Sequence, residues 1–358
     1  MEKVRFGLVG AGAIAASHIT GINGTPGAEL SAICEKNPAR VEELKKEYSA
    51  PCFTDIEGML ASGLVDAVDI TTPSGLHLEP AIKAIEAGVH VLVEKPMEIT
   101  TGRIDRMIEA AEAKGIKLGC VFQSRFRPLP RKIKSLIDGG ILGEIYSGSA
   151  YCKLYRTQEY YDSGGWRGTW EIDGGGALMN QGIHTVDFLL WNMGGVEELI
   201  AIAESRGRKN VEVETLAIAL LKFKNGAKGV IEATTLAYPQ LPDYLEIFGS
   251  RGTITFNSSS VTRFELIDPS PGEEKARDEV LSWDKQKDLH RMDVRKKDVG
   301  TVVTSADQGH GPVIEDFIQS IRTGGEPYIP GKEARRSVEL ITSIYESAKN
   351  NSKPVRLR

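Results

Sequence analysis

The chain has 358 residues, of which 41% are hydrophobic and 26% charged, and it carries a formal net charge of −5. A chain of this length predicts two domains, each large enough to bury a core. Charges of both signs are dispersed, and no apolar run approaches the roughly 20 residues that span a bilayer, so we expect neither a nucleic-acid partner nor a membrane segment.

The first third of the chain alternates short apolar strands with amphipathic helices. Strands are predicted at 5–10, 29–34, 67–71, 89–94 and 117–122, and helices at 38–48, 78–87 and 103–114. Strands separated by segments of helix length indicate right-handed βαβ units and a parallel sheet. We therefore predict a doubly wound α/β domain over residues 1–123.

A glycine-rich loop follows the first predicted strand and opens a helix pattern, with the sequence Gly10-Ala11-Gly12-Ala13-Ile14-Ala15. Gly10 permits a tight turn, and Gly12 lets the backbone approach a pyrophosphate. The helix that starts near Ala13 and Ile14 then supplies amide donors. Because the loop lies between strand and helix of the first βαβ unit, it predicts a Rossmann dinucleotide site. The alternative is a tight turn with close helix packing.

Glu35 ends the second predicted strand, 23 residues after Gly12. A carboxylate there can accept hydrogen bonds from both ribose hydroxyls and would repel a 2′-phosphate, which favours NAD over NADP. Lys36 and Arg40 follow closely, and either could offset that repulsion. His77, in a later loop, either caps the next helix or lies near the cofactor.

The strand at 89–94 runs directly into Lys95 and Pro96. Side chains at the carboxyl end of such a strand face the crevice where open α/β sheets bind ligands. A lysine there can hold a substrate oxygen or act as an acid–base group. The alternative is that Glu94 and Lys95 form a solvated pair at the strand end.

After Arg125 the pattern changes to longer β-rich segments. A helix at 130–138 precedes strands at 144–154, 197–204, 211–223, 227–236, 244–248, 253–256 and 262–266. Asn225-Gly226 predicts a hairpin turn, and consecutive strands indicate a mainly antiparallel sheet covered on one face by helices. We interpret 272–298 as a loop or surface insertion and predict helices at 312–323 and 332–349. This α+β domain is predicted to span 124–358, and its last helix could pack back on the first domain.

A second glycine-rich segment, Gly174-Gly175-Gly176, leads into an apolar helix pattern. If the segment is helical throughout, Asn180, His184 and Asp187 lie on one face. Histidine is the usual acceptor of a hydroxyl proton near neutral pH, whereas the alternative is a core histidine that a carboxylate such as Asp187 satisfies. No cysteine or second histidine stands at zinc-ligand spacing, so we expect no metal.

An aromatic and arginine-rich loop precedes this helix, with Tyr155-Arg156, Tyr160-Tyr161 and Trp166-Arg167. Aromatic faces and guanidinium groups suit a sugar or an anionic group such as a carboxylate or phosphate. A contact between domains or subunits would use the same residue types.

The four cysteines are far apart in the sequence and show no metal-ligand or redox spacing: Cys34, Cys52, Cys120 and Cys152. We expect reduced and mostly buried thiols. Since the first strand begins almost at Met1, no signal peptide is expected, and we predict a cytoplasmic protein.

These motifs together resemble the glucose–fructose oxidoreductase/inositol dehydrogenase (Gfo/Idh/MocA) superfamily. The resemblance covers nearly the whole chain and rests on the glycine loop, Thr72-Pro73-Ser74 with His77, Glu94-Lys95-Pro96, Gln123-Ser124-Arg125-Phe126, and residues 174–187. It implies a Rossmann domain followed by a large, mostly antiparallel sheet. That sheet commonly forms contacts within dimers or tetramers, so we expect a homodimer or homotetramer.

The resemblance also implies an NAD-linked dehydrogenase that oxidises a secondary hydroxyl of a sugar, a polyol or a sugar nucleotide. His184 would take the hydroxyl proton, Lys95 would stabilise the substrate oxygen, and Asn180 would orient the sugar or the histidine. Many sugar and polyol dehydrogenases of the family carry aspartate where this chain has Asn180. In this respect it is similar to nucleotide-sugar uronate 3-dehydrogenases.

The expected contacts fall into two sets. Expected cofactor contacts are Gly10, Gly12, Ala13, Ile14, Glu35, Arg40, Thr72, Pro73, Ser74, His77, Glu94, Lys95 and Gln123. Expected substrate contacts are Lys95, Arg125, Trp166, Arg167, Asn180 and His184. Two other functions stay open: redox-neutral glycoside cleavage with tightly held NAD, and a non-enzymatic sensor that binds a dinucleotide.

Overall fold

The computed structural model describes residues 2–283 and 309–357. The chain divides into two compact units, the first formed by Met1–Gln123 with Thr301–Arg335 and the second by Ser124–Gly300 with Arg336–Arg358. The predicted division had placed the whole of 124–358 in one domain. The helix that follows residue 309 therefore belongs to the first unit, and the last long helix begins in the first unit and ends in the second.

The first unit contains a six-stranded sheet in the order β3-β2-β1-β4-β5-β6. All of its strand pairs are parallel. The strands are β1 (Val4–Val9), β2 (Ala28–Cys34), β3 (Cys52–Phe53), β4 (Ala67–Ile70), β5 (His90–Val93) and β6 (Leu118–Cys120). This is the strand order of a doubly wound dinucleotide-binding fold, and it confirms the predicted α/β class. β3, only two residues long, was not predicted.

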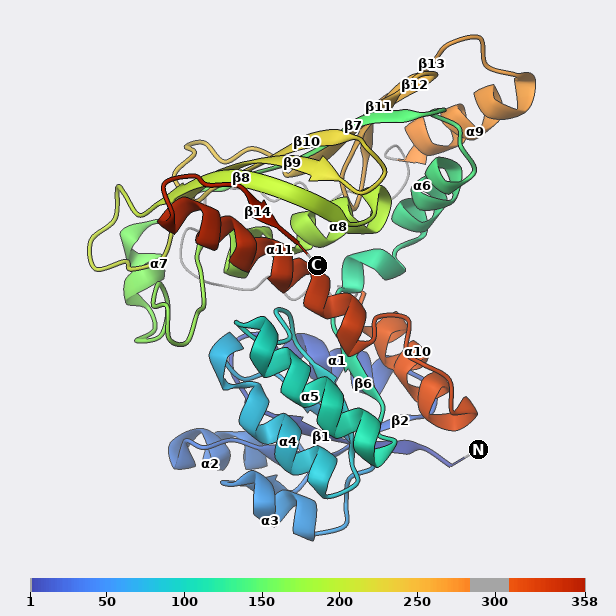
Figure 1. Cartoon of the computed structure of the whole chain (residues 1–358). Coiled ribbons are helices and arrows are strands. Elements are labelled where there is room, and N and C mark those ends of the chain that lie inside the picture. Colours follow the sequence, from blue (N-terminus) through green and yellow to red (C-terminus); the bar gives the residue numbers. More distant parts are fainter. Residues whose placement is uncertain (1, 284–308, 358) are drawn as a thin grey trace. The chain divides into compact units, whose positions relative to one another are not determined.

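The helices of the first unit are α1 (Ala15–Gly24), α2 (Pro38–Glu47), α3 (Ile56–Ala61), α4 (Leu78–Glu86), α5 (Thr101–Lys114) and α10 (His310–Thr323). They follow the predicted order, and α3 is the one addition to it. The unpredicted α3 is capped by Asp55, whose side chain accepts a hydrogen bond from Gly58 N. α10 comes from the far end of the sequence and packs against α1 (Figure 1).

The second unit contains an eight-stranded sheet in the order β13-β12-β11-β7-β10-β9-β8-β14. Its strands are β7 (Ile145–Lys153), β8 (Val196–Glu204), β9 (Leu216–Phe223), β10 (Lys228–Thr234), β11 (Tyr244–Gly249), β12 (Gly252–Phe256), β13 (Val261–Leu266) and β14 (Val355–Arg356). Of the pairs, only β7 with β10 is parallel among the described residues, so the sheet is mainly antiparallel as predicted. The hairpin turn predicted at Asn225-Gly226 joins β9 to β10, and Gly226 has a φ of +90°.

The second unit contains α6 (Pro128–Asp138), α7 (Gln158–Asp162), α8 (Ile183–Met193), α9 (Pro271–Leu281) and the part of α11 (Gly331–Lys349) that follows Arg335. Of these helices, α7 and α9 were not predicted from the sequence. α8 packs against β7 and β11, on one face of the sheet (Figure 1).

The interpretation of 272–298 as a loop is wrong for its first part, because α9 covers Pro271–Leu281. Ser270 and Glu273 form a capping box that starts this helix, and only Val280 is buried in it. With one buried side chain the helix has no apolar periodicity to reveal it. The remainder of the predicted loop, 284–298, lies outside the described residues.

The four cysteines are free thiols, and Cys34, Cys120 and Cys152 are buried, as predicted. Burial raises the pKa of the Cys34 and Cys152 thiols to about 12, which keeps both protonated. Within the described part of the chain, no helix is both long enough and apolar enough to cross a membrane.

Candidate functional site

The glycine loop connects β1 to α1 at the carboxyl end of the parallel sheet. Gly10 has a φ of +92°, and a Cβ there would lie 2.9 Å from the backbone nitrogen of Thr72. A Cβ on Gly12, in contrast, would meet no described atom within 4 Å. No described side chain caps α1 at Ile14. The loop is thus tightly packed at Gly10 and open at Gly12 and at the helix start, which fits a dinucleotide pyrophosphate.

Glu35 lies beside this loop, directly after β2. Its Oε2 accepts a hydrogen bond from Ala11 N at 2.9 Å, and its Oε1 accepts one from Asn37 N at 2.8 Å. These bonds fix the carboxylate next to the open part of the glycine loop, where it fits the adenosine ribose of NAD. Arg40 is engaged elsewhere, because its guanidinium donates to Glu43 and Glu47 on its own helix α2.

Two further loops adjoin the glycine loop at the same edge of the sheet. The Thr71 hydroxyl donates to Gly10 O at 2.5 Å and ties the loop after β4 to the glycine loop. The buried His77 ring lies with Nε2 2.8 Å from Thr72 O and Nδ1 3.0 Å from Pro96 O. His77 makes no side-chain cap on α4, so its observed contacts brace the loop after β4 against the turn after β5.

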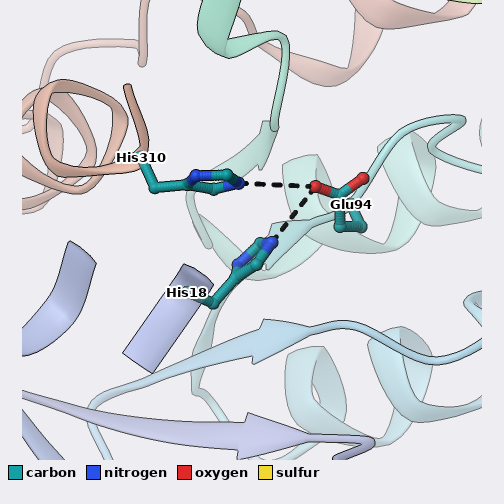
Figure 2. A group of neighbouring side chains, drawn as sticks. All are labelled: His18, Glu94 and His310. Atoms are coloured by element: carbon teal, nitrogen blue, oxygen red, sulfur yellow. Dashed lines mark hydrogen bonds and ion pairs between the residues drawn. The ribbon is translucent and has the colours of Figure 1, made fainter. Parts of the chain in front are cut away.

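Glu94 and Lys95 stand at the end of β5, and they are not a solvated pair. Glu94 is buried, and its Oε2 accepts a hydrogen bond from Lys95 N at 2.7 Å. Its Oε1 lies 3.1 Å from Nε2 of the buried His18 (Figure 2). Lys95 itself is half-buried, and its peptide bond to Pro96 is cis. The alternative of a solvated pair at the strand end is therefore excluded.

A buried carboxylate in the second unit holds the glycine-rich segment that leads to His184. Glu214 accepts hydrogen bonds from Gly176 N at 2.9 Å, from Leu178 N at 2.8 Å and from the Tyr345 hydroxyl at 2.9 Å. Burial raises the pKa of the Glu214 carboxyl to about 7, against the hydrogen bonds, which lower it. Glu214 was not predicted as a functional residue, because it stands in an apolar segment predicted as strand.

Residues Ala177–Gly182 form a π-helical turn, and α8 begins only after it. Gln181 N donates to Gly176 O at 3.2 Å, five residues back, so the turn is wider than an α-helical one. The predicted single face of Asn180, His184 and Asp187 assumed α-helical geometry throughout, whereas Asn180 lies in the π-helical turn and the other two residues lie in α8. Instead, the Asn180 side-chain amide donates to Asp173, and His184 is half-buried on the first turn of α8.

Arg125 is committed to a buried ion pair within the second unit. Its Nε and Nη2 donate to Asp187 at 2.7 and 2.6 Å, and the two side chains are only 3% and 1% exposed. Ser337 adds a hydrogen bond to the same carboxylate. Arg125 therefore serves this buried ion pair, and its expected contact with the substrate stays a prediction.

The aromatic and arginine-rich stretch forms a connected polar cluster with the π turn. Arg167 donates to the Tyr160 hydroxyl at 2.7 Å, and its guanidinium lies 4.5 Å from the centre of the Tyr160 ring and 4.7 Å from that of Trp166. Gln181 donates to the same hydroxyl at 2.8 Å and to Asn180 Oδ1 at 2.7 Å. The arginine cluster, as we name it, comprises Arg156, Tyr160, Trp166, Arg167, Asn180 and Gln181.

Gln181 completes this cluster and was not predicted. Its Oε1 accepts a hydrogen bond from Arg156 Nε at 3.0 Å, so it joins both arginines to the π turn. Glutamine in a helix pattern carries no chemical signature of its own, and only the π turn brings it to the cluster. The cluster thus brings two guanidinium groups and aromatic faces close to Gln181, which is bonded to Asn180, while the Asn180 amide itself is held by the Asp173 carboxylate.

Comparisons with known proteins agree with this geometry. Residues 4–122 match the GFO_IDH_MocA oxidoreductase family, which has an NAD-binding Rossmann fold, and residues 131–255 match the C-terminal domain of the same family. The structure of the WlbA dehydrogenase from Bordetella pertussis, in complex with NADH and UDP-GlcNAcA, is similar with a TM-score of 0.86 and 34% identity, over 100% of this chain and 98% of that one. The myo-inositol 2-dehydrogenase of Thermotoga maritima is 25% identical over 94% of each chain. The D-glucoside 3-dehydrogenase of Escherichia coli is 30% identical over 54% of this chain and 55% of that protein.

Proposed function

The chain belongs to the Gfo/Idh/MocA family of NAD-dependent oxidoreductases, and we propose that it oxidises a secondary hydroxyl of a nucleotide sugar that carries a carboxylate. The arginine cluster around Asn180 is the observation that carries this proposal, because two guanidinium groups beside aromatic faces suit a sugar carboxylate. The likeness to a dehydrogenase bound to UDP-GlcNAcA supports it. When bound, NAD supplies the hydride acceptor.

In this proposal Lys95 and His184 are the two reacting groups. Lys95, anchored through its backbone to the buried Glu94, donates a hydrogen bond to the substrate oxygen and stabilises its developing negative charge. His184, on the first turn of α8, takes the hydroxyl proton. Asn180 orients the sugar or the histidine, and the carboxylate of Glu35 with the open backbone at Gly12 holds the cofactor.

The substrate class is tested by following NADH formation with a matched pair, UDP-GlcNAcA and UDP-GlcNAc, and with inositols and simple aldoses. The proposal expects NADH with the acid and little with the others. A clear preference for a neutral polyol would contradict the substrate class. Cleavage of a glycoside without NADH formation would instead support redox-neutral chemistry.

Replacing Arg167 with alanine should raise KM for the acidic substrate about 10- to 100-fold, because one charge-assisted hydrogen bond contributes about 1.5–3 kcal/mol. Steady-state kinetics on UDP-GlcNAcA and UDP-GlcNAc measure this. Arg206→Ala serves as the control, since Arg206 is exposed and paired with Glu204. An unchanged KM for the acid would contradict the assignment, and an equal rise for both sugars would assign Arg167 to the diphosphate.

The enzyme should prefer NAD to NADP by at least about tenfold in kcat/KM, because the Glu35 carboxylate repels a 2′-phosphate. Arg40, which could offset that repulsion, is held by Glu43 and Glu47. Glu35→Ser should reduce the preference, whereas Glu29→Ser, at an exposed position on the strand that precedes Glu35, should not. A wild-type enzyme that prefers NADP would overturn this reasoning.

One face of the eight-stranded sheet exposes a group of apolar side chains, and we propose that a second copy of this chain covers it. Ile200 pairs with Leu220 and Ile202 with Ile218 across β8 and β9, and all four are exposed. Such a contiguous apolar patch is typical of an interface between subunits.

Ile202→Lys should shift the protein toward monomer, because a lysine in a self-complementary apolar patch would be buried without a partner. Size-exclusion chromatography with light scattering measures the mass. Ile267→Lys is the matched control, since both isoleucines are 61% exposed but Ile267 follows β13, at the opposite edge of the sheet from β8 and β9. A wild-type chain that is monomeric at high concentration would contradict the proposal.

A further inference from the structure

A cluster of buried ionisable groups lies within the first unit, beside Glu94. His18 comes from α1, Glu94 follows β5, and His310 is the first residue of α10. Both imidazole rings point toward the same Glu94 oxygen, with His18 Nε2 at 3.1 Å and His310 Nε2 at 3.8 Å (Figure 2). The two rings lie 4.5 Å apart between their centres. Three segments distant in the sequence thus meet at one carboxylate.

A second buried carboxylate binds the other side of His18. Nδ1 of His18 lies 2.7 Å from Oδ2 of Asp69, which stands on β4 and is fully buried. A neutral imidazole has one N–H and can donate to only one of two carboxylates, so contacts on both sides favour the doubly protonated ring. Burial by itself would lower the pKa of His18, but Asp69 and Glu94 raise it to about 10. His18 is therefore an imidazolium between two carboxylates at neutral pH.

The Glu94 carboxylate divides its two oxygens between His18 and the backbone of Lys95. Oε1 faces His18, whereas Oε2 accepts the Lys95 N–H at 2.7 Å. Burial by itself would raise the pKa of Glu94, but His18 and His310 hold it well below its usual range. A carboxylate that is ionised and bonded on both oxygens cannot rotate without losing one of these contacts.

We propose that His18 is a positioning residue for Lys95: its imidazolium fixes the Glu94 carboxylate, and Glu94 fixes the peptide that carries Lys95. This inference rests on the proposed function, in which Lys95 contacts the substrate oxygen. Because His18 stands on the helix that opens at the glycine loop, the same contact joins that helix to the turn after β5. His310 covers the Glu94 oxygen from another side and packs its Cβ against Gly21.

A metal ion is the other occupant that this cluster could hold, since His18, Glu94 and His310 each offer one ligand atom within 4.8 Å of the others. Metal ligation would require a bare nitrogen lone pair on His18 Nε2 aimed at an ion. Nε2 instead lies at hydrogen-bond distance from Glu94, and Nδ1 at hydrogen-bond distance from Asp69. Hydrogen bonds account for both contacts without a metal ion. The experiment below therefore also measures the metal content of the purified protein.

The experiment is a double-mutant cycle with His18→Gln and Lys95→Ala. We expect His18→Gln to lower kcat about 10- to 100-fold while KM for NAD and the NADH dissociation constant stay within about threefold. In the Lys95→Ala background the same change should lower kcat by no more than about twofold, because the residue that it positions is gone. A purely structural role would lower kcat in both backgrounds equally.

The control is His90→Gln, at the opposite end of β5, where Nδ1 accepts a hydrogen bond from Lys117 N. This variant should leave kcat unchanged. If His18→Gln does not fold, His310→Gln tests the same chain of contacts, with a smaller loss that also disappears in the Lys95→Ala background.

Three results would overturn the inference. Equal losses in both backgrounds, no loss in a folded His18→Gln variant, or a stoichiometric metal ion in the purified protein would each do so. A Lys95→Ala variant with normal kcat would instead contradict the proposed function, because Lys95 would then have no role in the reaction.

Discussion

Replacing Lys95 with alanine is expected to lower kcat by at least about a hundredfold, and His184→Ala should have an effect of the same order. Lys95 stabilises negative charge on the substrate oxygen, and His184 takes the proton from it, so both act chiefly in the transition state. The measurement is steady-state kcat with saturating NAD and substrate. The loss should appear in kcat far more than in KM for NAD.

The double variant should be little slower than the slower single variant, since residues that act as a unit are strongly non-additive. Lys114→Ala, at the exposed end of α5, is the control for the loss of a lysine and should retain full turnover. Near-normal kcat in both single variants would defeat the assignment of both residues.

Asp187→Ala is expected to lower the free energy of unfolding by about 3–5 kcal/mol, the usual cost of leaving one buried charge without its partner. Asp187 accepts two hydrogen bonds from Arg125, and both side chains are almost fully buried. Urea denaturation of the wild type and the variant measures the difference.

Glu197→Ala is the matched control, because Glu197 forms a solvent-exposed pair with Lys222 and should contribute little to stability. If Asp187→Ala were as stable as the wild type, the ion pair between Arg125 and Asp187 would not stabilise the fold. Its predicted part in substrate binding would then have to be considered again.

Most of the fold could be predicted because its elements carry clear periodic signals. Buried parallel strands such as β1 and β5 are continuous apolar runs, and the helices between them have apolar stripes. α9 was missed since a helix with one buried side chain shows no stripe. β3 and α3 were missed because they are short and depend on pairing with neighbouring segments.

The candidate site could be predicted only where a local motif carries the chemistry. The glycine loop, Glu35 and the Lys95 turn follow predicted strands directly, so their positions come from the order of elements. Glu214 and the pairing of His18 with Glu94 depend on contacts between distant segments, which no single stretch of sequence reveals.

The π turn and the ion pair of Arg125 were not predicted, for related reasons. The helix pattern around Asn180 looks α-helical in sequence, and the wider turn depends on backbone bonds to Gly176 and on Glu214. Arg125 was assigned to substrate by residue type, whereas its burial against Asp187 is a tertiary feature. Residue chemistry indicates what a side chain can bind, but its packing decides what it does bind.

The central claim is that hydride passes from a sugar carbon to NAD, and isotope transfer tests it most directly. The enzyme would be incubated with NAD and with UDP-GlcNAcA deuterated at its ring carbons, and the NADH formed would be examined by mass spectrometry. We expect NADH that carries one deuterium, and almost none from the Lys95→Ala and His184→Ala variants. Conversion of the sugar without deuterium in the nicotinamide would contradict the account.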